Sequence, residues 1–299
     1  MRAMIPRLAK VRSCLVLGLA TLVMALPLRE RSAWAEEVAA FPPEARIVSI
    51  GGSLTEIVYA LHAESRLVAR DSTSTYPKAA ESLPSIGYMR QLSPEGVLSL
   101  HPGGILSLAT SGPPEAVAVL RQAGVPMVEV PEAYDAKGVV EKIRKVGAAL
   151  GKSTEAEALV TRVEAGLKPV TARVERLAER QRVLFVLSAQ GGKIMAAGTG
   201  TAADGMIRLS GGINAVEGYA GYKPLSDEAL IDARPDLILV MDHAGPGASD
   251  ADLLSHPGIA ATPAGQKRRI LRMDGSYLLG FGPRTAEAAR DVSEALYGH

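Results

Sequence analysis

The sequence predicts an α/β protein whose two lobes are joined by one long helix. Short β-branched runs alternate with amphipathic segments along the chain, which is typical of parallel strands connected by helical crossovers. A stretch of helical composition divides this alternation into two series, and one segment of the first series recurs in the second. Two similar lobes explain both observations.

The first series begins with a strand at 46–50, a tight turn at 51–53 and a helix at 54–61. A strand at 67–69 is followed by a polar loop, 71–77, which cannot continue the sheet through its proline. We therefore expect this loop at the carboxyl end of a strand. The series continues as strand, helix and strand at 105–108, 114–122 and 127–130.

The composition from 153 to 182 predicts one long helix that is capped at Ser153 and kinked at Pro169. At 1.5 Å per residue this helix would be on the order of 40 Å long, too long for a crossover within one small sheet. We expect it to bridge the lobes. The predicted boundaries are a signal peptide at 1–35, an N-terminal lobe at 36–152, a connecting helix at 153–181 and a C-terminal lobe at 182–299.

The internal repeat aligns 92–106 with 225–239 without gaps, and the same register aligns a trailing Gly-Pro in each half. Each copy holds a Ser N-cap, an acidic first turn, a short helix, a proline and a buried strand. Any unit of helix, proline and strand shares part of this pattern. The matching glutamates, Glu95 and Glu228, and the common register favour two similar lobes.

The N-terminus has the pattern of a secretory signal peptide. Basic residues precede an apolar run at 13–28, and the Ala-Trp-Ala at 33–35 resembles a cleavage site. The run is shorter than the roughly 20 residues of a membrane span, so we expect cleavage after Ala35 and no membrane-spanning segment afterwards. An uncleaved anchor is the alternative. The only cysteine, Cys14, lies in this leader, and a chain without thiols suits an oxidising compartment.

Composition and motifs argue against a nucleic-acid partner and against an enzyme. The formal net charge is +1, and no long run of like charges occurs. Ser53 lacks the second glycine of a nucleophile elbow, and the histidines form no H-x-x-x-H pair. Bare zinc or manganese is not expected either, because histidines and carboxylates are not clustered in the sequence. A binding protein is the better interpretation.

Four segments carry distinctive motifs: RIVSIGGSLTEIVYAL at 46–61, STYP at 74–77, GYMRQLS at 87–93 and GPR at 282–284. Together they resemble the periplasmic heme-binding proteins of bacterial heme ABC importers. The Tyr-Pro loop followed by the Gly-Tyr segment is specific to heme binders within the class III proteins, which also bind vitamin B12 and siderophores. The resemblance implies two Rossmann-like lobes joined by one long helix, with heme in the interlobe cleft of a periplasmic monomer.

The resemblance makes Tyr76 of the Tyr-Pro loop an axial ligand of heme iron. Ferric iron is a hard cation that favours anionic oxygen, and a phenolate supplies it. Coordination competes with the proton, so iron can hold a phenolate near neutral pH although tyrosine ordinarily titrates near pH 10. A neighbouring cation would help, and the candidates are Lys78, Arg90 and Lys223. An exposed aromatic residue before a turn proline is the alternative interpretation.

Heme is a flat, apolar macrocycle with two carboxylates, so its site needs apolar walls and a few cations near the propionates. Arg90 and Lys223 could meet propionates, and ordinary surface charges are the alternative. The loop at 198–203 matches G-x-G-x-x-A but lacks the setting of a dinucleotide site. The candidate wall residues are Tyr88, Met89, Arg90, Tyr222, Lys223, Gly198 and Thr199.

Some relatives use a histidine of the second lobe or hold two stacked hemes. The repeat places His243 just beyond the buried strand of the second lobe, where ligand sites of open α/β sheets gather. A solvated loop histidine is the alternative. The sequence leaves one heme or two open.

Glu95 and Glu228 occupy equivalent positions in the two copies of the repeat. In related binding proteins, glutamates at this place dock against arginines of the permease, and two carboxylates would engage the two subunits of a dimeric partner. Favourable interaction with the helix dipole is the alternative. The implied partners are heme and an ABC permease dimer with its ATPase.

Vitamin B12 or a ferric siderophore is the main alternative ligand. A binding protein for either would share the fold and explain every observed motif except the Tyr-Pro loop.

Overall fold

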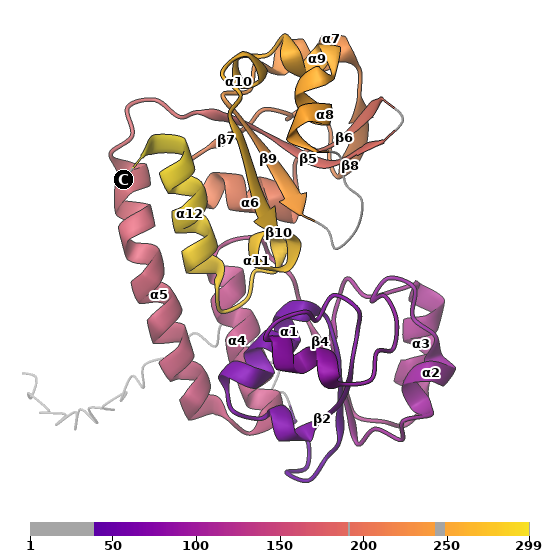
Figure 1. The fold of residues 1–299 in the computed structure, drawn as a ribbon. Coiled ribbons are helices and arrows are strands. Elements are labelled where there is room, and N and C mark those ends of the chain that lie inside the picture. Colours follow the sequence, from indigo (N-terminus) through magenta and orange to yellow (C-terminus); the bar gives the residue numbers. More distant parts are fainter. Residues whose placement is uncertain (1–38, 191, 243–248, 299) are drawn as a thin grey trace, which may run out of the picture. The chain divides into compact units, whose positions relative to one another are not determined.

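Two β-sheets organise the part of the chain that the computed structural model describes, residues 39–190, 192–242 and 249–298 (Figure 1). One sheet has four strands in the order β2-β1-β3-β4, and the other has the order β10-β9-β5-β6-β8 with β7 paired to β5. Contacts join both sheets and their helices into one unit. The predicted α/β fold of two lobes is confirmed.

The first sheet is parallel throughout, as expected. Its central strands β1 and β3 are buried along their whole length, which is typical of parallel strands covered by helices on both faces. The strands are β1 (Ile47–Ile50), β2 (Leu67–Arg70), β3 (Gly104–Leu108) and β4 (Met127–Val130). The helices are α1 (Gly52–Ala60), η1 (Glu64–Arg66), η2 (Lys78–Ser82), α2 (Pro94–Leu98), α3 (Pro114–Gln122) and α4 (Ala136–Leu150).

The long helix α5 (Ser153–Glu175) packs against α4 and against α12 (Thr285–Tyr297). Figure 1 shows it running beside both helices, from the first sheet toward the second. The helix continues through Pro169 and ends at Glu175, before the expected position 181. The N–H groups of Arg176 and Leu177 bond to carbonyl groups three residues earlier, and this tight turn closes the helix.

The second sheet is mixed rather than purely parallel. Strand β5 pairs in parallel with β9 but antiparallel with β6, and β6 is antiparallel to β8. Gly192, with a φ of 72°, supplies the left-handed residue that a tight hairpin between β5 and β6 requires. The sequence predicted strands and turns for the second series without their direction, and the structure supplies this antiparallel hairpin.

The strands of the second sheet are β5 (Arg182–Gln190), β6 (Lys193–Ala197), β7 (Ile213–Asn214), β8 (Tyr222–Leu225), β9 (Leu237–Asp242) and β10 (Ile270–Asp274). The helices around it, besides α12, are α6 (Ala202–Leu209), α7 (Asp227–Ala233), α8 (Asp250–Ser255), α9 (Pro257–Ala260), α10 (Pro263–Gln266) and α11 (Gly275–Leu279).

The sequence repeat corresponds to a repeated unit of structure. Ser93 and Ser226 cap α2 and α7 in the same way, each accepting a hydrogen bond from the N–H group three residues later. The aligned residues His101 and Arg234 both adopt the left-handed conformation, with φ of 47° and 44°. Few residues other than glycine do so, and their agreement supports the register read from the sequence.

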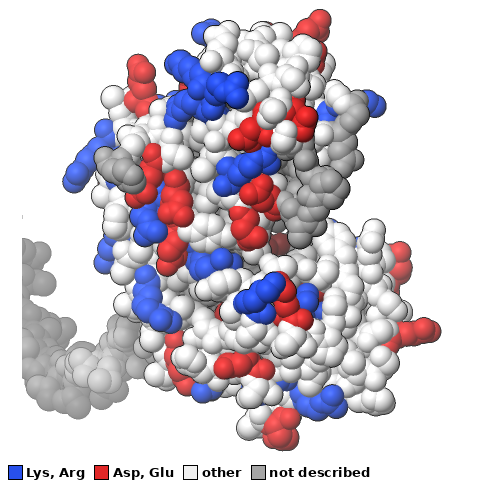
Figure 2. Space-filling model, viewed as in Figure 1, with Lys and Arg blue, Asp and Glu red and all other residues white. Residues whose placement is uncertain are grey.

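Lys, Arg, Asp and Glu side chains are intermixed on the face of the molecule drawn in Figure 2. This mixture agrees with the formal net charge of +1 and with the absence of long charged runs in the sequence. Within the described ranges, no helix is both long and apolar enough to cross a membrane.

Candidate ligand-binding site

The loop that follows β2 is anchored to the start of α1 through Asp71, which is buried. One carboxylate oxygen of Asp71 accepts hydrogen bonds from the backbone N–H of Gly51 at 3.0 Å and the hydroxyl of Ser74 at 2.8 Å. The other accepts from the N–H of Thr73 at 2.9 Å and its hydroxyl at 2.7 Å. The base of the loop is thus fixed, while Tyr76 further along it is 44 % exposed.

Arg284, from the loop between α11 and α12 in the second lobe, lies on the ring of Tyr76. The central carbon of its guanidinium is 3.6 Å from the ring centroid. Its Nη2 donates to Oε2 of Glu56 in α1 at 2.9 Å, and its backbone N–H donates to Oε1 at 3.2 Å. The ring of Tyr277 lies 5.1 Å from the same guanidinium carbon. A cation of one lobe is therefore held against the loop that follows β2 in the other.

The cations expected beside Tyr76 have other partners. Lys78 forms an ion pair with Glu81 at 2.5 Å. Arg90 bonds to Tyr88, and Lys223 lies over the ring of Tyr219 at 5.2 Å. The cation that lies beside Tyr76 is instead Arg284 of the GPR motif, a residue for which the sequence predicted no role.

Tyr88, Arg90 and Tyr222, all predicted from the sequence, form a second group that contains residues of both lobes. Nη1 of Arg90 donates to the hydroxyl of Tyr88 at 2.8 Å. Burial raises the pKa of Tyr222 in β8, whereas a hydrogen bond with Thr201 and the positive charge of Arg90 oppose that rise. Tyr88 and Tyr222 remain 39 % and 38 % exposed, so both rings can contact a ligand.

Two residues not predicted from the sequence, Glu132 and Tyr134, lie beside this second group. Burial raises the pKa of Tyr134 to about 12, Glu132 adds to the rise, and Arg90 opposes it. Oε2 of Glu132 accepts hydrogen bonds from Thr110 at 2.7 Å and from the hydroxyl of Tyr134 at 3.4 Å. Both residues lie in the segment between β4 and α4, and a position beyond the carboxyl end of a parallel strand was the signal that could have identified them.

Three other predicted wall residues make contacts within the protein. Met89 is 4 % exposed and belongs to the hydrophobic core. The N–H and hydroxyl groups of Thr199 donate to the carbonyl oxygen of Tyr219 at 2.9 and 3.2 Å. Gly198 is buried, and a Cβ at this position would lie 2.5 Å from a ring carbon of Tyr219. Close packing against Tyr219 thus explains the glycine.

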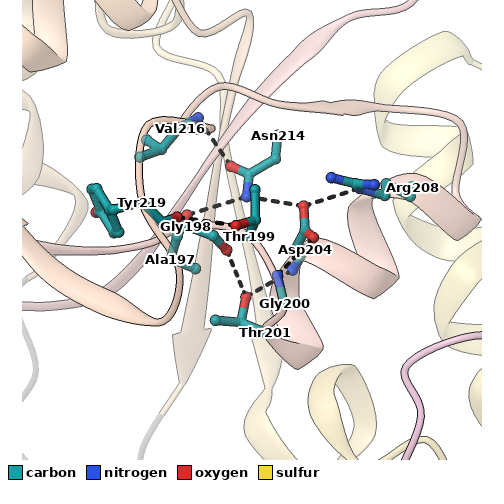
Figure 3. A network of polar contacts seen from close by, with 10 residues as sticks. All are labelled: Ala197, Gly198, Thr199, Gly200, Thr201, Asp204, Arg208, Asn214, Val216 and Tyr219. Carbon is teal, nitrogen blue, oxygen red and sulfur yellow. Dashed lines mark hydrogen bonds and ion pairs between the residues drawn. The ribbon is translucent and has the colours of Figure 1, made fainter.

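A polar network closes the loop between β6 and α6 (Figure 3). The carboxylate of Asp204 accepts hydrogen bonds from the N–H of Gly200 at 3.1 Å and from Nδ2 of Asn214 at 3.1 Å. Thr201 caps α6 by accepting from the N–H of Asp204 at 3.1 Å. Arg208 neutralises the same carboxylate at 3.1 Å. These contacts give the glycine-containing segment a structural part in holding β6 to α6.

The other predicted site residues are distributed as follows. Glu95 and Glu228 are both exposed and lie in the first turns of α2 and α7. His243 lies outside the residues that the structure describes. Across the described ranges, no group of three or more His, Cys, Asp and Glu side chains could hold a metal ion.

The protein has two α/β lobes joined by one long helix, and tyrosine and arginine side chains of the two lobes are in contact. This architecture is that of a two-lobed binding protein. The chain belongs to the periplasmic binding protein family, whose model matches residues 47–277. The class of protein predicted from the motifs is confirmed.

Two solved structures extend the comparison to most of the chain. The periplasmic heme-binding protein BhuT, in complex with two hemes, is 41 % identical with a TM-score of 0.80, and the match covers 84 % of this chain and 97 % of BhuT. The periplasmic heme-binding protein RhuT from Roseiflexus sp. RS-1, in apo form, is 41 % identical with a TM-score of 0.79 and the same coverage. The resemblance to periplasmic heme-binding proteins is confirmed.

Curated relatives are more distant. YvrC of Bacillus subtilis, an uncharacterized ABC transporter substrate-binding lipoprotein, is 26 % identical over 84 % of this chain and 80 % of its own length. The vitamin B12-binding protein of Vibrio vulnificus is 24 % identical over 84 % of this chain and 90 % of its own length. This chain is therefore a substrate-binding protein of an ABC transporter.

Proposed function

We propose that this protein captures heme in the periplasm and delivers it to an ABC permease in the inner membrane. The observation that carries the proposal is Tyr76, an exposed tyrosine on an anchored loop with the guanidinium of Arg284 on its ring. Ferric iron favours an anionic oxygen ligand, and a phenolate beside a cation provides one. The names of the similar structures BhuT and RhuT support heme as the ligand.

The second group of residues supplies the surroundings that heme requires. The rings of Tyr88 and Tyr222 offer apolar faces to the macrocycle, and Arg90, which donates a hydrogen bond to Tyr88, is suited to a propionate. Lys223, which follows Tyr222 directly, is the second propionate candidate. His243 is proposed as a ligand from the second lobe, and the number of hemes, one or two, follows from the titration described below.

The mature protein begins after Ala35 in this proposal and acts as a monomer, by binding and release rather than by catalysis. Its lobes comprise 36–152 and 182–299, with the segment 153–181 between them. Glu95 and Glu228, one exposed on each lobe, dock on the two subunits of a permease dimer that the ATPase drives.

Vitamin B12 is the second candidate ligand, and the curated relatives favour it. Cobalamin carries its metal inside a corrin ring and has neutral amide side chains in place of propionates. It would therefore make little use of Arg90 and would not require Tyr76 as a metal ligand.

A titration with ferric heme, followed by absorption spectroscopy, tests the proposal. Wild type should bind saturably and show a high-spin ferric spectrum with a phenolate charge-transfer band, and the endpoint gives the stoichiometry. Tyr76→Phe should abolish that band, whereas Tyr59→Phe, which changes a tyrosine of α1, should retain it. The spectrum of His243→Ala shows whether His243 of the second lobe is a ligand of heme iron. Absence of saturable heme binding, with saturable binding of cyanocobalamin in parallel calorimetry, would replace heme by the alternative ligand.

A further inference from the structure

The backbone of Arg284 belongs to the second lobe, but its guanidinium reaches Glu56 and Tyr76 of the first lobe, besides Tyr277. It precedes α12, which packs against α5 and α6, so its backbone belongs to the second lobe. Its guanidinium contacts Glu56 and Tyr76, which belong to α1 and to the loop after β2. The contact between Arg284 and Tyr76 therefore depends on how the two lobes are placed against each other.

The guanidinium of Arg284 is held firmly from its own side. Glu56 is buried, and its two carboxylate oxygens accept one hydrogen bond from the side chain and one from the backbone of Arg284. The preceding Gly282 packs closely on Ser53, since a Cβ at Gly282 would lie 3.4 Å from that of Ser53. A planar guanidinium fixed in this way presents one face to the ring of Tyr76.

Arg284 also retains an unused donor. Its Nε is buried and has no hydrogen-bond partner among the described residues. Native proteins leave few buried donors unpaired, and such groups call for an explanation. An acceptor that arrives with the ligand would satisfy this N–H.

We infer that Arg284 is a positioning residue that orients Tyr76 for iron coordination and is itself held in place by Glu56. A cation on the face of an aromatic ring restrains the ring and leaves the hydroxyl at its edge available. The same positive charge stabilises the phenolate that coordinates iron. This inference rests on the proposed function, because it assigns a partner to the proposed axial ligand. It also implies that separating the lobes withdraws Arg284 from Tyr76 and weakens the bond to iron.

The test uses Arg284→Gln, Arg284→Lys and Glu56→Gln, with Arg290→Gln as the matched control. Arg290 is an exposed arginine of α12 that pairs only with Asp291 and Glu294 in the described contacts. Arg284→Gln should weaken heme binding on the order of tenfold, speed heme transfer to apomyoglobin and shift the phenolate charge-transfer band. Arg284→Lys, which keeps the charge but loses the planar contact, and Glu56→Gln should lie between it and wild type. The control should match wild type, and urea unfolding verifies that each variant is folded.

A measurement without heme separates the inference from the proposed function. In protein labelled with 3-fluorotyrosine, the fluorine resonance that disappears in Tyr76→Phe belongs to Tyr76. Arg284→Gln should move this resonance, and Arg290→Gln should leave it in place. Heme binding that depends on Tyr76 but is indifferent to Arg284→Gln would overturn the inference alone. A wild type that binds no heme would overturn the proposed function and the inference with it.

Discussion

The ammonium group of Lys142 in α4 lies 3.5 Å from the carbonyl oxygen of Gly280, just after α11 of the second lobe. The same Nζ lies 3.2 Å from Oγ of Ser53 and 3.4 Å from Oε1 of Glu132. Burial lowers the pKa of Lys142, and the charge of Glu132 opposes this effect. A buried lysine with acceptors from both lobes forms a structural junction between them.

Lys142→Met should lower the free energy of unfolding by about 3 kcal/mol. The carboxylate of Glu132 is nearly buried, and the substitution removes its ion-pair partner. Urea denaturation measures the change. The double variant Lys142→Met/Glu132→Gln should recover part of the loss, since it also removes the unpaired charge. Lys137→Met on the exposed side of α4 is the control and should change stability by less than about 0.5 kcal/mol. If Lys142→Met were as stable as wild type, Lys142 would not stabilise the contact between the lobes.

From the raised pKa of Tyr134 we predict how the free energy of unfolding changes in alkaline solution. Its folded pKa of about 12 lies above the ordinary value of 10.0, so the unfolded chain loses this proton first as the pH rises. The stabilisation is therefore present below pH 10 and is lost as the pH rises toward 12. Tyr134→Phe should remove this component and flatten the decline between pH 10 and 12. Wild type and Tyr134→Phe are unfolded with urea at the same pH values, so that the contributions of the other tyrosines cancel in the difference. If the two plots of unfolding free energy against pH were parallel, the raised pKa of Tyr134 would be refuted.

Local signals predicted most of the first lobe from the sequence. The bounds of α3 (Pro114–Gln122) and β4 (Met127–Val130) were found because a proline begins the helix and a β-branched run forms the strand. The hairpin of β5 and β6 was missed, because strand direction depends on the turn at Gly192 and composition does not report it. The end of α5 was also misplaced, since the residues after Glu175 still favour a helix.

The candidate site could be predicted residue by residue but not contact by contact. The motifs identified Tyr76, and both Glu56 and Arg284 stood in quoted motifs without an assigned role. Glu56 and Arg284 are 228 positions apart, and only the fold brings them together. Lys78 was a reasonable candidate cation because it is close to Tyr76 in the sequence, yet the carboxylate of Glu81 pairs with it.

A disulfide between residues 53 and 282 tests whether heme release requires the α11–α12 loop to leave α1. A Cβ at Gly282 would lie 3.4 Å from Cβ of Ser53, close to the roughly 3.5–4.5 Å of disulfides. In oxidised Ser53→Cys/Gly282→Cys protein, heme transfer to apomyoglobin should slow on the order of tenfold, and reduction with dithiothreitol should restore the rate of the unlinked protein. The two single-cysteine variants control for the substitutions themselves. Equal rates before and after reduction would show that release proceeds without this separation.

Substitution of Glu95 and Glu228 should impair delivery to the permease and leave heme binding intact. Charge reversal at both positions, Glu95→Arg/Glu228→Arg, should reduce stimulation of the ATPase of the purified heme permease on the order of tenfold or more, because arginines would then face arginines. Each single variant should lie between the double variant and wild type, since each lobe engages one subunit. Glu115→Arg changes an equally exposed first-turn glutamate, in α3, and should stimulate normally. Heme titration should be unchanged in all four proteins. If the double variant stimulated the ATPase as wild type does, the two glutamates would serve only the dipoles of their own helices.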